Sequence, residues 1–185
     1  PAPFKKKSVP FTPPFSLINQ YTLRPFNIAY YQKNKLKSRI STEYYESFFY
    51  PLDSILNWNK IYGPKGFYQY QCLVPRKAGH EAIREMLQLI AKSGNGSFLG
   101  VLKTFGDRAA PGMLSFPRSG VTLALDFRNA DEKTLRLFNT LDQILVESGG
   151  RIYMAKDARM PASVFESGYP NFNEFKKYRD PRLSS

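Results

Sequence analysis

Residues Gly66 to Pro75 read GFYQYQCLVP, and this stretch decides the fold because its apolar and polar side chains alternate. An alternation with a period of two predicts a β-strand whose two faces meet different surroundings. One face carries Phe67, Gln69, Gln71 and Leu73, and the other carries Tyr68, Tyr70, Cys72 and Val74. The glutamines are either solvated amides of a half-exposed strand or part of a face that binds a ligand.

The sequence after this strand predicts a helix from about Ala78 to Ser93. The positions that share one helical face, and are therefore expected in the core, are Ile83, Met86, Leu87 and Ile90. Two more strands are predicted over residues 97–105 and 121–127. A second helix, capped by Asn129 or Asp131, is predicted to stop at Gly149. This order predicts an α+β fold, with helices on one face of a mainly antiparallel sheet.

The N-terminal third is less regular. Residues 1–15 are rich in proline and are expected to be a flexible segment. Residues 16–33 have a helical pattern that Pro25 should divide into two short pieces. The aromatic run at residues 41–50 predicts a strand that ends at Pro51. A short helix is predicted from Asp53 or Ser54 to Ile61.

The character of the chain changes again at residues 151–159, RIYMAKDAR. A short strand carries Tyr153, and the charged residues Lys156, Asp157 and Arg159 cluster at its end. Lys156 and Asp157 are either an exposed ion pair, worth at most about 1 kcal/mol, or part of a site, since strand ends commonly carry sites. Short helical segments are predicted over residues 163–166 and 172–178.

Composition limits the classes of function. The 185 residues are long enough for one domain, or for one domain and a small piece of another. A formal net charge of +12 favours polyanionic partners, namely nucleic acid, anionic lipid or phosphorylated substrates. One cysteine, Cys72, excludes an internal disulfide, and one histidine, His80, argues against metal sites and histidine-based catalysis.

The sequence shows no targeting or membrane-spanning segment. No run approaches the roughly 18 apolar residues of a membrane span. The N-terminus is basic and proline-rich and lacks the apolar stretch of a signal peptide. Because residue 1 is Pro1 and not methionine, we expect the sequence to be a fragment or a processed form.

A basic module that binds single-stranded nucleic acid is the alternative from another functional class. In that interpretation Tyr68, Tyr70 and Phe98 would stack on bases, while scattered lysines contact phosphates. A ferredoxin-like RNA-binding sheet is one such α+β layer, but its characteristic glycine and aromatic motif is absent.

Four ordered stretches carry a family resemblance: FFYPLDSILNWNKIYGPKGFYQYQCLVP, GSFLGVLKTFG, LSFPRSGVTLALDF and GGRIYMAKDARMPASVFESGYPNFNEFKKYRDP. Together they resemble the C-terminal part of FAD-linked oxidases of the vanillyl-alcohol oxidase type. Within that family, the enzymes that oxidise polyprenyl-phosphoryl pentoses are most similar, and the sugar-lactone oxidases are more distant. The resemblance extends over nearly the whole chain from about Pro10.

The resemblance implies three segments: a flexible segment at 1–15, a partial substrate-binding domain at 16–150, and a return segment at 151–185 that packs on an FAD-binding domain. The glycine-rich loops that hold FAD in this family are absent, so this chain is not expected to retain FAD or to be active alone. The expected partners are the missing FAD-binding domain, a polyprenyl-phosphate or other sugar, a reductase and a membrane surface, with no nucleic acid. The implied location is the bacterial cytoplasm or the membrane periphery.

The resemblance also implies roles for single residues. Lys156 matches the lysine beside the flavin ring, where a fixed cation would stabilise developing negative charge. Tyr153 matches a flavin-contacting tyrosine, and Gln71 matches a glutamine that faces both the cofactor and the reacting centre. The residues matching the substrate pocket are Gln69, Leu99, Val101, Lys103, Phe105, Thr122 and Tyr50. No metal site is implied.

These matches imply an FAD-dependent oxidoreductase acting on a CH–OH group, by hydride transfer from C2' of a polyprenyl-phosphoryl pentose to flavin N5. A sugar-1,4-lactone oxidase is the closer alternative. The sequence departs from the mycobacterial enzymes at two pocket positions, where Thr122 and Ala124 replace asparagine and cysteine. The pocket is therefore expected to be less polar there and to lack the thiol.

Overall fold

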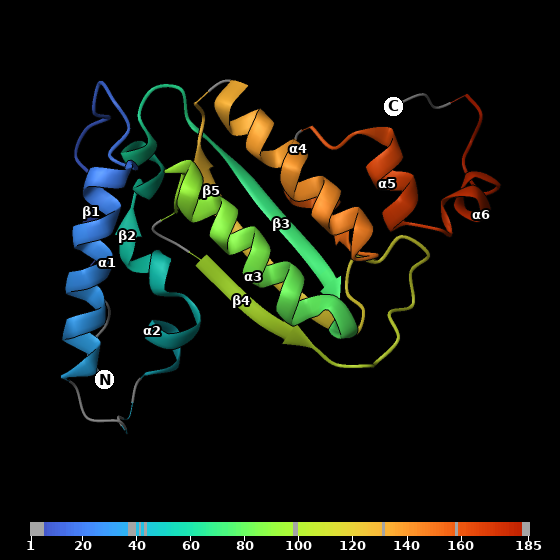
Figure 1. Cartoon of the computed structure of the whole chain (residues 1–185), viewed down its shortest axis with the longest axis horizontal. Helices are drawn as coiled ribbons and strands as arrows, with labels where there is room; N and C mark the ends of the chain where they lie inside the picture. The colour runs from blue at the N-terminus through green and yellow to red at the C-terminus, as the bar shows by residue number, and fades with distance from the viewer. Residues whose placement is uncertain are drawn as a thin grey trace.

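The computed structural model describes residues 6–36, 40, 42, 44–97, 100–130, 132–157 and 159–182. Its centre is a four-stranded antiparallel sheet formed by β3 (Phe67–Pro75), β4 (Gly100–Phe105), β5 (Gly120–Arg128) and β6 (Arg151–Ile152). The strand order is β4-β5-β3-β6, so the alternating stretch identified from the sequence is an interior strand (Figure 1). The α+β prediction is confirmed.

Two long helices, α3 (Arg76–Ser93) and α4 (Glu132–Glu147), run alongside one another over one face of this sheet (Figure 1). Gly79 permits the close approach of α3, because a Cβ atom there would lie 2.9 Å from Val121 Cγ2. The buried core between sheet and helices contains Tyr70, Cys72 and Val74 of β3 together with Met86 and Phe138. The period-two alternation of β3 therefore predicted its core-facing side correctly.

The N-terminal segment differs from the prediction. One continuous helix, α1 (Gln20–Lys35), contains Pro25, whereas two short pieces were predicted. Asn19 and Thr22 form a reciprocal capping box that satisfies backbone donors at the start of the helix. Pro25 lies in the second turn and removes a single backbone donor, and the helix continues past it.

The strand predicted over residues 41–50 is wrong. Residues Tyr45–Phe49 form a short helix, α2, whose aromatic side chains Tyr45, Phe48 and Phe49 are exposed. Aromatic residues favour strands because their side chains pack well on a half-buried pleated sheet. Among the described residues no strand pairs with this segment, so that packing is not available to it. The helix predicted up to Ile61 is replaced by two 3-10 turns on either side of β2 (Ile55–Leu56), which pairs with β1 (Lys7–Ser8).

The C-terminal segment returns to the sheet through β6 and a 3-10 turn at Met154–Lys156, followed by α5 (Ala162–Gly168) and α6 (Phe172–Lys176). The Tyr169 hydroxyl donates to the Ile152 carbonyl at 2.6 Å, and the Arg151 guanidinium lies over the Tyr169 ring. These contacts hold α5 against the edge strand.

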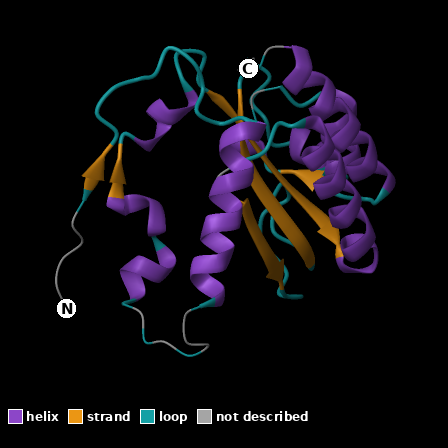
Figure 2. Ribbon diagram, turned by 60° about the vertical axis from the view of Figure 1, so that its left-hand side comes forward, coloured by secondary structure: helices purple, strands orange, loops and turns teal. Residues whose placement is uncertain are grey.

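Figure 2 shows α3 and α4 to one side of the four strands, with α1 and the β1–β2 ladder apart from that helical layer. Among the described residues, none of the helices combines the length and apolarity needed to cross a bilayer.

We expect Met86→Ala and Leu87→Ala to have different costs although they are neighbours in α3. Met86 is fully buried, whereas Leu87 is 41% exposed, which corrects the prediction that Leu87 belongs to the core. Met86→Ala should lower the free energy of unfolding by about 2–5 kcal/mol, and Leu87→Ala by less than about 1 kcal/mol. Urea unfolding followed by circular dichroism measures both, and equal losses would contradict this placement of the core.

Candidate functional site

The side of the sheet turned away from α3 and α4 carries the paired glutamines. Residues directly opposite one another in an antiparallel pair share a face, and the register places Gln69 opposite Asp126 and Gln71 opposite Ala124. We call this side the amide face. By the same register its other described members are Phe67, Leu73, Thr122 and Arg128, together with Val101, Lys103 and Phe105 of β4.

Gln71 is fixed by a short chain of hydrogen bonds. The Thr122 hydroxyl donates to the Cys72 carbonyl at 2.8 Å, so its single proton is already used. The Gln71 Nε2 group donates to Thr122 Oγ1 at 3.5 Å. Because Thr122 is only 3% exposed, it serves this face by orienting Gln71 rather than by reaching outward.

Aromatic rings enclose one end of the amide face. The Tyr153 backbone N–H donates to the Gln71 carbonyl at 2.8 Å, which attaches the segment after β6 to β3. Phe116 stacks against the Tyr153 ring with centroids 4.6 Å apart and meets Phe105 edge-on. The structure therefore brings together three of the predicted site residues, Gln71, Tyr153 and Phe105. Phe116 was missed, because nothing in its loop sequence shows where the loop returns.

Lys156 ends the 3-10 turn that begins just after Tyr153, and its side chain is exposed. It forms no ion pair with the described residues. Its charge nevertheless acts on the Asp126 carboxyl group, whose pKa it lowers, so the lysine lies near the amide face. A free cation beside two neutral amides can stabilise negative charge on a bound ligand.

Asp126 is a member of the amide face that the sequence analysis did not single out. It is 2% exposed, and burial raises its pKa, while the amide of Gln69, the charge of Lys156 and the hydroxyl of Tyr62 act in the opposite direction. The pKa of Tyr62 is raised, first by its own burial and then by the Asp126 charge. The alternation in VTLALDF already placed Asp126 on the same face as Thr122, but it gave no sign of burial.

The remaining predicted residues are more scattered. Val101 is half-buried and Lys103 is exposed on β4, whose outer edge no described strand covers. Tyr50 lies at the end of α2, where it lines a separate pocket of about 450 Å³ with Lys6 and Asp53 among others. Leu99, predicted in the substrate pocket, and Phe98 lie outside the described residues.

A groove of about 990 Å³ lies between α3 and β4, on the opposite side from the paired amides. Leu87, Leu102 and Val121 give it an apolar wall, and Arg76 and Arg84 of α3 supply positive charge. Leu102 is 57% exposed, so the helix-facing side of β4 is much less covered than that of β3 and β5.

The two tyrosines that the nucleic-acid alternative needs for base stacking face the helices. Tyr70 is 1% exposed in the core, and Tyr68 packs against Phe138 on the same helix-covered side, so these rings do not form a platform for bases. Within the described ranges, no group of three or more histidine, cysteine, aspartate or glutamate residues could hold a metal ion.

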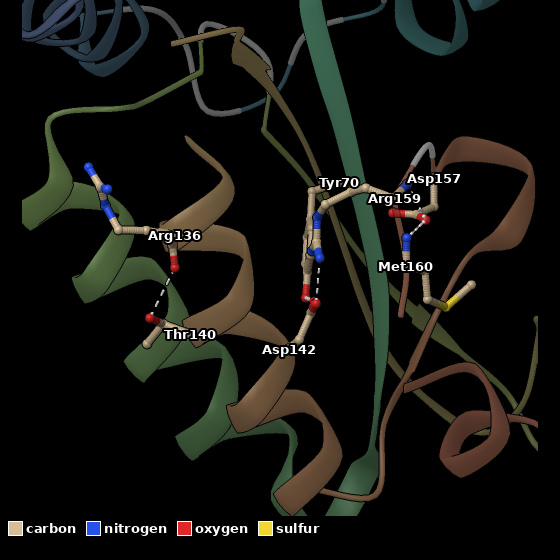
Figure 3. A network of polar contacts seen from close by, with 7 residues as sticks. All are labelled: Tyr70, Arg136, Thr140, Asp142, Asp157, Arg159 and Met160. Carbon is tan, nitrogen blue, oxygen red and sulfur yellow. Dashed lines mark hydrogen bonds and ion pairs between the residues drawn. The ribbon is translucent and has the colours of Figure 1, made fainter. Parts of the chain in front are cut away.

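A buried ion pair fastens the segment after Lys156 to α4 (Figure 3). Arg159 Nη1 lies 2.8 Å from Asp142 Oδ2, and the Tyr70 hydroxyl donates to Asp142 Oδ1 at 3.0 Å. The Arg159 guanidinium also lies over the Phe138 ring, 4.9 Å from its centroid. Asp157 caps this turn by accepting the backbone N–H groups of Arg159 and Met160. Lys156 is therefore held between this anchor and the Tyr153 contact with β3.

No protein-family model matches the chain, whereas four known proteins do, two of which are described here. The chain is 38% identical over 168 residues to the decaprenylphosphoryl-beta-D-ribose oxidase of Mycolicibacterium smegmatis, covering 90% of this chain and 35% of that protein. It is 30% identical over 118 residues to a Streptomyces coelicolor protein described as an uncharacterized protein in mprA 5'region, covering 62% of this chain and 31% of that protein.

The chain spans about a third of the length of these relatives. The match to the oxidase confirms the resemblance to one part of such an enzyme, and the antiparallel sheet with helices on one face fits a substrate-binding domain.

We expect Arg159→Met to be far more damaging than Arg136→Met, which makes the same change at an exposed ion pair of α4. Arg159→Met leaves the buried Asp142 carboxylate without its cation, which should cost about 3–5 kcal/mol of stability. Arg136→Met removes a pair with Glu132 whose side chains are 72% and 83% exposed, and should cost less than about 1 kcal/mol. Urea midpoints of both variants test this, and similar values would show that the buried pair does not anchor the segment.

Proposed function

We propose that this chain is the substrate-binding part of an FAD-dependent oxidoreductase that oxidises a hydroxyl group of a polyprenyl-phosphoryl pentose at C2'. The observation that carries the proposal is the 38% identity over 90% of the chain to an oxidase named for decaprenylphosphoryl-beta-D-ribose. It is supported by the amide face, where Gln69 and Gln71 lie on one side of the sheet, and by Lys156, whose charge acts on Asp126 of that face.

The residues of the amide face fit a flavin. Lys156 is an exposed cation without an ion pair among the described residues, and Tyr153 and Phe116 offer aromatic surface beside it. In the proposed enzyme, Lys156, Tyr153 and Gln71 would hold the ring system, while another part of the protein would bind the rest of FAD. When bound, FAD supplies the hydride acceptor at N5.

The chain's own residues would bind and orient the sugar. Gln69 and Gln71 are neutral amides, so they direct the substrate hydroxyl by hydrogen bonds and do not remove its proton. Lys156 would stabilise the negative charge that develops nearby during oxidation. Val101 and Phe105 would line the pocket wall.

The substrate class follows from charge and polarity. Lys103 projects from the exposed strand β4, where it would meet a phosphoryl group. The net charge of +12 also suits a phosphorylated lipid or the surface of an anionic membrane. We place the enzyme in the bacterial cytoplasm or at the membrane periphery, with oxygen, a quinone or a partner reductase taking the electrons.

We expect Lys156→Ala, made in a protein that joins this chain to its FAD-binding part, to abolish flavin reduction by a farnesyl-phosphoryl ribose. Lys92→Ala, which removes an exposed lysine in the last turn of α3, is the matched control and should reduce flavin at the normal rate. Anaerobic stopped-flow absorbance measures the rate, and circular dichroism checks the fold. Normal reduction by the Lys156 variant would exclude the assigned role.

We expect the purified 185-residue chain to be colourless, because it lacks the glycine-rich loops that hold FAD. Mixed with a separately expressed FAD-binding domain, it should perturb the visible flavin spectrum, and Lys156→Ala should weaken that perturbation. A yellow chain would show that these residues hold the cofactor by themselves. An unchanged spectrum on mixing would argue against a flavin beside the amide face.

A further inference from the structure

Asp126 is a buried carboxylate to which the proposed reaction assigns no role. Its side-chain oxygens are inaccessible, and neither has a hydrogen-bond partner within the part of the chain that the structure describes. An ionised carboxylate in such a place costs folding free energy. A cost of this kind is typical of groups that serve a site at the expense of stability.

The neighbours of Asp126 are the donors of the amide face. Gln69 lies directly opposite it in the β3–β5 register, and the Gln69 amide lowers the pKa of the carboxyl group without forming a hydrogen bond of normal geometry. Tyr62 and Lys156 are the titratable groups that act on it from other elements. Contacts of this kind are often long without a ligand and tighten when one binds.

A carboxylate only accepts hydrogen bonds, so it orients the amide in front of it. The Nε2 group of Gln69 must turn toward Asp126, which leaves Oε1 directed away from the carboxylate. Thr122 orients Gln71 in the same way, with the amide nitrogen held and the carbonyl oxygen directed away. Because the Thr122 proton is used on the Cys72 carbonyl, Thr122 Oγ1 can only accept from Gln71 Nε2. Both amides are therefore held by their nitrogen atoms, and both carbonyl oxygens are left for a ligand.

We propose that Asp126 and Thr122 are positioning residues, which fix Gln69 and Gln71 so that the amide face presents two hydrogen-bond acceptors to a vicinal diol. The inference rests on the proposed function and deepens it. A sugar with neighbouring hydroxyl groups supplies two donors for the two carbonyl oxygens, whereas a ligand with acceptors at these positions is rejected.

The first test uses NMR of the 185-residue chain and does not depend on activity. Thr122→Val should shift the side-chain amide signals of Gln71, and Asp126→Asn should shift those of Gln69. The wild-type Gln69 signals should also move as Asp126 titrates, at a pH above the usual range for aspartate because burial raises its pKa. Thr140→Val and Glu81→Gln, on exposed faces of α4 and α3, are matched controls and should leave both pairs of signals unchanged.

Stability separates positioning from a structural role. Since the folded-state pKa of Asp126 lies above that of the unfolded chain, the folded state loses stability as pH rises through this range. Asp126→Asn should therefore keep or raise the urea midpoint at pH 7, although it disturbs the site. A lowered midpoint together with unchanged Gln69 amide signals would overturn the role given to Asp126, and unchanged Gln71 signals in Thr122→Val would overturn that of Thr122.

The second test measures recognition in the enzyme assembled with its FAD-binding part. Asp126→Asn and Thr122→Val should each raise KM for farnesyl-phosphoryl ribose on the order of tenfold, the effect of one lost hydrogen bond. On the analogue that lacks the non-reacting neighbouring hydroxyl, only the variant whose glutamine binds that hydroxyl should lose its effect on KM, and the other variant should still raise it. Adding Gln69→Glu to Asp126→Asn should restore recognition. The amide introduced at position 126 would donate to one carboxylate oxygen introduced at position 69, and the second carboxylate oxygen would accept from the ligand. Failure of that rescue, with equal losses on both substrates, would contradict the proposal.

The two tests separate the two proposals. If the wild-type assembly does not oxidise farnesyl-phosphoryl ribose, the proposed function fails, while the NMR shifts still decide whether Asp126 and Thr122 orient the amides. If oxidation is normal and the amide signals do not respond, the positioning roles fail and the proposed function stands.

Discussion

The nine-residue antiparallel register between β3 and β5 is the constraint on which the rest of the structure depends. It places Tyr70, Cys72 and Val74 in the core and Gln69 and Gln71 on the opposite face. A shift of the pairing by one residue would exchange these faces, burying two amides and exposing the tyrosine that bonds to Asp142. The core and the candidate site are thus fixed by the same set of backbone hydrogen bonds.

The sequence analysis was most accurate where one periodic pattern dominated. The alternation in β3 predicted both faces, and three of the four residues in the predicted stripe of α3 are buried. It failed where the outcome depended on distant partners. Leu87 fits the stripe but lies at its rim, and the aromatic run before Pro51 has a strand composition but pairs with no strand of the described residues. Pro25 was expected to break α1, but the helix is capped at Asn19 and continues past the proline.

In the candidate site, too, local patterns predict some positions, whereas contacts between distant residues determine the others. Gln69 and Gln71 could be placed on one face from local alternation alone, whereas Thr122 joins that face only through the β3–β5 register. The position of Lys156 could not, because it depends on Arg159 reaching Asp142 on α4 and on Asp142 meeting Tyr70 of β3 (Figure 3). These contacts join residues that are 17 and 72 positions apart in the chain. Burial of Asp126 likewise depends on the whole fold, and a sequence pattern gives only its face.

The outer edge of β4, with the apolar groove beside it, also affects how copies of the chain behave toward one another. Unpaired strand edges and exposed apolar surface promote self-association, and Leu102 lies at the centre of both. The net charge of +12 opposes this through mutual repulsion. Added salt screens that repulsion but leaves the apolar attraction in place. The colloidal stability of the isolated chain is therefore set by ionic strength as much as by the free energy of folding.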